Sequence, residues 1–337
     1  MLWESQARED IGLYGIVIRY HFYCGQLMSD NPAWYDHGLE FPSKTHQIQV
    51  AGARILFETW GEVGQPGIVL IHGSNAHRNW WRFVAPYLAD QFRVAALDLS
   101  GNGDSEWRTR YTGDELAAEV FAVSEAADLG PNPYVVGHSF GGFVALKTAA
   151  NYGAQLGGVI FNDFTTAPPE RSTEWGMRVE RDGIEPGRKT RVYADIDTAL
   201  GRFRFVPEQP NRYPAVTSYI GRQGLREVDG GVTWKFDPGL FDYLEMGTNQ
   251  RDLFAALECP SAVITGEFST DEGALDGDYM RELCAGLLPV FKIPGTHHHM
   301  MFEEPIALAM AFKAIILGWQ AEAGRERIGA ALAGIKS

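Results

Sequence analysis

The sequence predicts an α/β protein: a mainly parallel, doubly wound sheet of about eight strands, with a helical lid inserted after the sixth strand. Three observations lead to this fold class. Short, continuously apolar runs alternate with helical patterns from residue 47 onward, which is typical of strands buried on both faces. The chain has 337 residues, 45% of them hydrophobic, enough for a large core. About a hundred residues separate Asp163 from the strand at Ala262, too many for one crossover.

The strands and helices are predicted in chain order. An antiparallel hairpin at 47–60 turns at Gly52 and opens the sheet. Six more strands are predicted from the apolar runs at 68–71, 94–97, 134–136, 159–161, 262–265 and 290–293. Helical patterns lie at 80–89, 115–128, 142–152 and 305–319.

These elements divide the chain into four parts. We expect an N-terminal extension at 1–45, a core at 46–166 and 246–319, a lid at 167–245 and a C-terminal helical tail at 320–337. Residues 1–27 precede a segment, Met28 to Pro32, that resembles an ordinary polar protein start, so whether they belong to the working protein stays open.

Charge and cysteine content exclude several classes of partner. The formal net charge of −14 repels a phosphate backbone and an anionic membrane surface, so neither nucleic acid nor membrane is expected as a partner. Three cysteines do not form a disulfide framework, which favours a reducing, cytoplasmic location. No run approaches the roughly eighteen uninterrupted apolar residues of a membrane span. Oligomeric state is left open.

The strongest motif is a glycine-rich turn between the strand at 134–136 and the helix that follows it. Its residues are Gly137-His138-Ser139-Phe140-Gly141-Gly142. Such a turn holds a serine in a strained backbone conformation, above the sheet and at a helix N-terminus, where developing negative charge is stabilised. The motif predicts Ser139 as a nucleophile.

A tetrahedral intermediate also requires two fixed N–H donors. One follows the nucleophile and the other comes from the loop after an early strand, which assigns the N–H groups of Phe140 and Ser74. His72, in the same loop, is better explained as a structural residue than as a base.

Three consecutive histidines, His297 to His299, follow the last strand. Adjacent residues cannot all face one ion, and no cysteine cluster or second histidine pair accompanies them, so no metal is expected. A neutral imidazole that takes the serine proton and returns it to the leaving group explains a histidine at this place.

With a nucleophilic serine, a later acid and a last histidine in that order, residues 46–319 resemble the α/β-hydrolase superfamily. In that superfamily the catalytic histidine often lies seven residues before a proline and five before an acid, and Pro305 and Glu303 then select His298. His297 and His299 depart from the usual neighbours and leave a one-residue ambiguity. Haloalkane dehalogenases and epoxide hydrolases use an aspartate nucleophile, so Ser139 places the resemblance in the serine branch.

The acid that orients His298 is ambiguous. In many superfamily members it stands three residues after the glycine that ends the strand before last, and here that position is Ser269. Asp163, at the end of the preceding strand, is our first candidate, since some members place the acid there. Asp271 is the alternative and Glu267 a weaker one.

The resemblance implies a cofactor-free serine hydrolase that cleaves a small or medium carboxylic ester through an acyl-enzyme on Ser139. A lactone or carbon–carbon bond hydrolase with the same three side chains, or a non-catalytic ligand-binding protein on the same fold, are the alternatives. We expect the lid to provide most of the substrate pocket, near Asn75, Trp80, Arg202 and Arg204. The near-neutral lid of an acidic protein suggests a substrate with an anionic end; the alternative is that Arg202 and Arg204 balance acidic residues of the lid on a solvated face.

Overall fold

The computed structural model describes residues 31–166, 168, 190–245, 247, 250–270 and 277–334. The strands are β1 (Lys44–Val50), β2 (Ala53–Trp60), β3 (Gly67–Ile71), β4 (Arg93–Leu97), β5 (Tyr111–Thr112), β6 (Tyr134–His138), β7 (Gly158–Asn162), β8 (Leu225–Val228), β9 (Gly231–Trp234), β10 (Leu244–Glu245), β11 (Ser261–Gly266) and β12 (Val290–Ile293). The α-helices are α1 (Ala33–Glu40), α2 (Gly113–Ala126), α3 (Phe140–Tyr152), α5 (Ile196–Leu200), α6 (Pro214–Gln223), α7 (Gln250–Ala255), α8 (Gly277–Leu283) and α9 (Pro305–Gly334). Short 3₁₀ helices are η1 (Arg78–Trp81), η2 (Ala85–Tyr87), η3 (Gly153–Gln155), η4 (Leu240–Tyr243) and η6 (Met300–Phe302).

The central sheet has eight strands in the order β1-β2-β4-β3-β6-β7-β11-β12. The pairs β1–β2 and β2–β4 are antiparallel, and every other neighbouring pair is parallel. All eight strands predicted from the sequence are present, and the fold class is confirmed. The parallel pairing brings the carboxyl ends of β6, β7, β11 and β12 to one edge of the sheet, which is where an open α/β sheet binds ligands.

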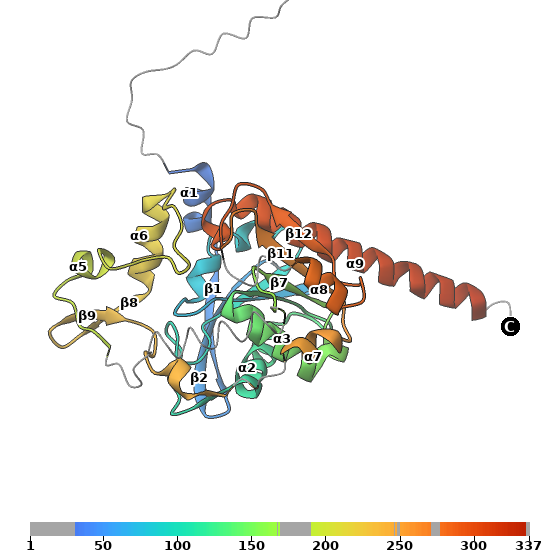
Figure 1. Ribbon diagram of the computed structural model, residues 1–337, viewed down its shortest axis with the longest axis horizontal. Coiled ribbons are helices and arrows are strands. Elements are labelled where there is room, and N and C mark those ends of the chain that lie inside the picture. The colour runs from blue at the N-terminus through green and yellow to red at the C-terminus, as the bar shows by residue number, and fades with distance from the viewer. Residues whose placement is uncertain are drawn as a thin grey trace, which may run out of the picture. The chain divides into compact units, whose positions relative to one another are not determined.

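Each face of the sheet packs against its own set of helices (Figure 1). In β3, Ile68 and Leu70 face a cluster that also contains residues of η1, η2 and α9, whereas Val69 and Ile71 face residues of α2 and α3. All four side chains are fully buried. This period of two, with both faces apolar, is the reason that the sequence shows an unbroken hydrophobic run at this strand.

The inserted segment is described from residue 190 to residue 245. It contains the helices α5 and α6, and also an antiparallel hairpin, β8–β9, that the prediction of a helical lid did not include. Arg226 and Thr233 are paired across that hairpin, which turns at Gly230, a glycine with a φ of 85°. In Figure 1 these elements group together to one side of the central sheet. Residues 167 and 169–189 of the predicted lid lie outside the described residues.

Three predicted boundaries change. The helix expected at 80–89 is replaced by η1 and η2, because Pro86 lacks the N–H that a continuous helix would need there. The expected extension 1–45 ends inside β1, and Trp34 of α1 packs in the core against Phe83 at 5.4 Å between ring centroids. The helix predicted at 305–319 continues without a break to Gly334, through most of the expected tail.

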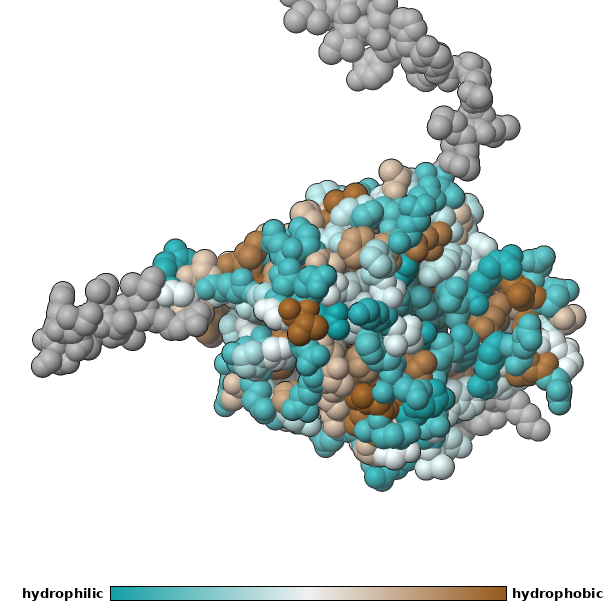
Figure 2. Space-filling model, turned by 180° about the vertical axis from the view of Figure 1, so that it is seen from behind, coloured by the Kyte–Doolittle hydropathy of each residue, from teal (hydrophilic) through white to brown (hydrophobic). Residues whose placement is uncertain are grey.

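The C-terminal helix α9 is the one helix of the described chain that is long and apolar enough, by length and composition, to cross a membrane, over Pro305–Glu326. Its residues Leu308, Phe312 and Ile316 are fully buried in the core cluster, while Ile306, Met310 and Leu317 are exposed. On the face drawn in Figure 2, hydrophobic residues form separate patches among hydrophilic ones. The buried residues of α9 form one stripe, which packs against the sheet as the apolar face of a core helix does.

Candidate active site

Ser139 lies in the tight turn between β6 and α3, with φ of 53° and ψ of −121°. This left-handed conformation is strained for any residue other than glycine, and it raises the serine above the end of the strand. The flanking glycines are required by close packing, since a Cβ on Gly137 would lie 2.1 Å from the carbonyl oxygen of Gly141. One on Gly141 would lie 2.4 Å from that of His72.

The three consecutive histidines have three different partners. His297 donates from Nδ1 to Glu303 at 2.9 Å, and His299 donates from Nδ1 to Gln209 at 2.7 Å. His298 donates from Nδ1 to Oδ2 of Asp163 at 2.5 Å, and both side chains are buried. Of the three, His298 is the one whose ring is bound to the predicted acid. The sequence left open, by one residue, which histidine is the base, and this hydrogen bond favours His298. Within the described ranges, no three metal-ligating side chains are grouped to hold an ion.

Asp163 directly follows β7, beside Ser139 on the neighbouring strand. It is fully buried, its φ is 52°, and its carboxylate accepts three hydrogen bonds, from His298, from the hydroxyl of Ser269 at 2.5 Å and from the N–H of Gly266 at 3.0 Å. The serine at the expected acid position thus supports the acid on the neighbouring strand. The geometry favours Asp163 over Glu267, whose carboxylate accepts instead from Gly295 N–H at 2.7 Å. Asp271 lies outside the described residues.

Two more histidines surround His298, and sequence reasoning gave neither a role. The ring of His138 lies 4.7 Å from that of His298, and its Nε2–H donates to the His298 carbonyl at 3.0 Å. The His299 ring lies 4.7 Å from His298 on another side. Burial lowers the pKa of both His138 and His299 well below the usual value, so both are neutral near pH 7. The sequence shows His138 in the glycine-rich turn beside Ser139, but it does not show the contact of His138 with His298, 160 residues later in the chain.

The lid also holds the histidine loop, a second feature that the sequence did not indicate. Gln209 accepts from both the N–H and the Nδ1–H of His299, at 2.8 and 2.7 Å. Arg212 donates to the Gly295 carbonyl at 2.5 Å and forms an ion pair with the buried Glu303 at 3.4 Å. The position of His298 therefore depends on contacts from the insertion as well as from the sheet.

The two predicted oxyanion donors, the N–H groups of Ser74 and Phe140, belong to two different segments of the chain. Ser74 follows β3, and Phe140 is the first residue of α3, directly after Ser139. In the described part of the chain no hydrogen bond uses either N–H. His72 has both ring nitrogens occupied, with Nδ1–H donating to Gly73 at 2.7 Å and Nε2 accepting from Leu99 N–H at 3.1 Å. It is therefore placed as a structural residue.

A cavity of about 640 Å³ opens above Ser139. The predicted pocket residues Asn75, Trp80, Arg202 and Arg204 all line it, together with the histidines His77, His138 and His299. The core supplies one side of this cavity and the lid the other, as expected for a pocket between a sheet edge and an insertion.

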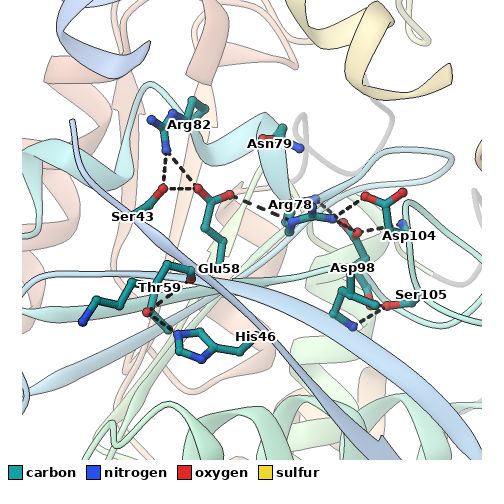
Figure 3. Close-up of polar contacts among 12 residues, drawn as sticks. Ser43, His46, Glu58, Thr59, Arg78, Asn79, Arg82, Asp98, Asp104 and Ser105 are labelled. Atoms are coloured by element: carbon teal, nitrogen blue, oxygen red, sulfur yellow. Dashed lines mark hydrogen bonds and ion pairs between the residues drawn. The ribbon is translucent and has the colours of Figure 1, made fainter. Parts of the chain in front are cut away.

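Charged side chains of the core form an ion network (Figure 3), which one ion pair extends to the lid. Arg78 binds Asp98 through its guanidinium and backbone N–H, and it also contacts Asp104 at 3.1 Å. Asp104 in turn pairs with Lys235 of the lid at 2.7 Å. Arg82 continues the network to Glu58 at 2.9 Å. Paired, hydrogen-bonded charges of this kind are costly to break, so they fix the loops around the pocket.

His77 makes the stability of the protein depend on pH. Its Nε2–H donates to the Ile220 carbonyl of the lid at 3.1 Å, and burial lowers its pKa to about 4. Below pH 6.5 the unfolded chain binds a proton that the folded chain does not, so stability is lost as pH falls toward 4. At pH 5 the low pKa of His77 in the folded state reduces the free energy of unfolding by about 2 kcal/mol.

We expect His77→Gln to reduce the fall in unfolding free energy between pH 7 and pH 5 by about 2 kcal/mol. Urea denaturation at the two pH values measures it. Between pH 7 and pH 8 the histidine is neutral in both states, so parent and variant should there show parallel curves. Equal losses in the two proteins on acidification would contradict the role given to His77.

Comparisons with known proteins agree with the fold. The model of the alpha/beta hydrolase family matches residues 68–311. A lipase of Mycobacterium tuberculosis is 30% identical over 148 residues, which are 42% of this chain and 56% of the lipase. A soluble epoxide hydrolase of a Corynebacterium species is 40% identical over 106 residues, 31% of this chain and 36% of that protein.

Among solved structures, an esterase of M. tuberculosis superimposes with a TM-score of 0.66 at 18% identity, covering 84% of this chain and 96% of the esterase. The similarity at that identity concerns the fold. The first curated relatives are matched over only about a quarter to just over half of their own length.

Proposed function

The chain belongs to the α/β-hydrolase family, and on that basis we propose that it is a serine hydrolase that cleaves a small or medium carboxylic ester through an acyl-enzyme on Ser139. One observation carries the proposal: the buried hydrogen bond from Nδ1 of His298 to Asp163, at the same sheet edge as the strained Ser139 turn. A serine, an imidazole and a carboxylate are the combination that activates a hydroxyl nucleophile, and the three residues assigned these roles follow three strands of the sheet.

The proposed reaction has two halves. In the first, Nε2 of His298 takes the hydroxyl proton of Ser139 as the serine oxygen attacks the ester carbonyl, and the N–H groups of Ser74 and Phe140 stabilise the oxyanion. The tetrahedral intermediate collapses, and His298 gives the proton to the leaving alcohol. In the second, His298 takes a proton from water, which attacks the acyl-enzyme, and the carboxylic acid leaves as the serine regains its proton.

The serine at position 139 distinguishes the proposed ester hydrolysis from the epoxide hydrolysis that the name of one relative indicates. The α/β-hydrolases that open epoxides or remove halide, which the sequence resembles in outline, use an aspartate at the position of Ser139. A serine alkylated by an epoxide or a haloalkane would form an ether, which a neighbouring water cannot hydrolyse as it does an ester. Acyl transfer therefore fits the chain better. The excess of acidic residues supports a small-molecule substrate over a nucleic acid, and a cytoplasmic location remains part of the proposal.

A fluorophosphonate probe followed by a substrate panel tests the proposal. We expect the probe to label Ser139 stoichiometrically, as detected by intact mass and by peptide mapping, because only an activated serine attacks phosphorus at an appreciable rate. The panel consists of short aryl esters, lactones and β-diketones. Turnover of aryl esters alone supports the ester proposal, whereas faster turnover of lactones or β-diketones would replace it with the corresponding hydrolase. Absence of both labelling and turnover would identify a ligand-binding protein.

A further inference from the structure

The geometry points to an ester that carries a carboxylate at its far end, held by Arg202 and Arg204 of the lid. This inference rests on the hydrolase function proposed above and adds the substrate class. It concerns the wall of the cavity opposite the nucleophile, which neither the Ser139 turn nor the histidine loop provides.

The side chains around the cavity carry a charge opposite in sign to that of the whole protein. The protein has a net charge of −14, yet the described residues that line the cavity include Arg202, Arg204 and Lys235 and no aspartate or glutamate. A pocket whose charge is opposite to that of the whole protein attracts an anion locally. Among the described residues, Lys235 is the only one of the three with an ion-pair partner, Asp104 at 2.7 Å.

The local structure of the lid places the two arginines. In the segment 202–205, Phe205 is buried in the core and Phe203 is half-buried, whereas both arginines are exposed; Arg202, Phe203 and Arg204 line the cavity. The guanidinium of Arg204 donates to the carbonyls of Gly201 and Phe203, at 3.0 and 2.6 Å. Carbonyl partners hold a guanidinium in place and leave its full charge available. In the described part of the chain, neither arginine has a carboxylate within ion-pair distance.

The opposite wall of the cavity is polar and uncharged. His77, His138 and His299 line it, and burial lowers the pKa of each, so the imidazoles are neutral at pH 7. Positive charge is thus confined to the lid side, and the ester group belongs at the neutral side, next to Ser139. A substrate with an ester at one end and a carboxylate at the other matches both walls. Arginine suits the carboxylate because its planar N–H groups bind both oxygens.

The test compares two pairs of esters of equal chain length. The 4-nitrophenyl monoesters of adipate and suberate carry a carboxylate, and 4-nitrophenyl hexanoate and octanoate carry a methyl group in its place. We expect the parent protein to prefer the charged ester of at least one pair in kcat/KM. Arg202→Gln and Arg204→Gln should each lower that preference about tenfold, and added salt should lower it in the parent protein.

Arg222→Gln is the matched control. Arg222 lies on the same lid, forms an exposed ion pair with Asp197 at 3.3 Å and does not line the cavity. This variant removes the same charge from the lid and should leave the preference unchanged. If neither Arg202→Gln nor Arg204→Gln changes the preference, or if Arg222→Gln changes it as much, the anion site is wrong.

A binding measurement separates this inference from the proposed function. Adipate and suberate are titrated calorimetrically into Ser139→Ala protein, with and without Arg202→Gln. Binding that Arg202→Gln weakens about tenfold, together with a parent protein that hydrolyses none of the esters, would retain the anion site and reject the hydrolase. Hydrolysis of all the esters at equal rates, with no binding that depends on Arg202, would retain the hydrolase and reject the anion site.

Discussion

Ser139→Ala is expected to lower ester turnover by on the order of 10⁴-fold or more. The loss follows from the removal of the attacking oxygen, which no neighbouring group replaces in the proposed reaction. Any residual rate would come from the oxyanion donors and from substrate binding alone. The measurement is kcat for the best aryl ester of the panel, together with loss of fluorophosphonate labelling.

The variant should fold as the parent does. Alanine is smaller than serine and keeps the same Cβ, which in the parent lies beside the backbone of Gly73, so no new contact is created at the turn. It also inherits the same φ of 53°, so the backbone strain is unchanged. Urea unfolding should therefore give a free energy within about 0.5 kcal/mol of the parent value. Turnover within about tenfold of the parent, in a folded variant, would exclude Ser139 as the nucleophile.

Asp163→Asn should have the second largest effect, a loss of about 10³- to 10⁴-fold in kcat. The parent carboxylate accepts from His298 Nδ1–H, which leaves Nε2 unprotonated and able to take the serine proton. An asparagine can keep the hydrogen bond from Gly266 N–H through its oxygen, but its NH₂ group then faces His298 and Ser269. His298 would accept at Nδ1 and carry its proton on Nε2, the tautomer that cannot act as a base.

Two companion variants make this result specific. Ser269→Ala removes one of the three hydrogen bonds to the same carboxylate and leaves the histidine tautomer unchanged, so its loss should be far smaller, about tenfold. Asp271→Asn tests the other candidate acid. Near-normal turnover in Asp163→Asn, combined with a loss of about a thousandfold in Asp271→Asn, would transfer the role to Asp271.

Contacts between the lid and the core stabilise the protein and also hold segments of the proposed active site. Gln209 and Arg212 hold the histidine loop, Lys235 pairs with Asp104, and His77 of the core donates to the carbonyl of Ile220. Each contact joins the insertion to the core, either in the segment around His298 or through a residue that lines the cavity. Loss of lid packing should therefore disorder the catalytic loop as well as open the pocket.

The sequence by itself determined the fold class and the nucleophile turn, because both are encoded over short distances. The inner strands β3, β4, β6, β7 and β11 appear as short apolar runs, since each is buried on both faces. The turn at Ser139 depends on adjacent residues, a strand, two close-packed glycines and a helix start, all within about a dozen positions. Local elements outside these runs differed from the prediction. Pro86 divides one expected helix, and the lid contains the hairpin β8–β9 in addition to helices.

Tertiary structure alone decided which histidine meets which acid. The spacing to Pro305 and Glu303 favoured His298 but left a one-residue ambiguity. Neighbouring residues on a loop point in different directions, so only the folded chain shows that His298 is held by Asp163 and His297 by Glu303. The same holds for Ser269, whose hydroxyl turns an apparently empty acid position into support for Asp163, 106 residues earlier in the chain. Such pairs form because parallel strands bring their carboxyl ends to one edge of the sheet, and that alignment is a property of the assembled sheet, not of any one segment.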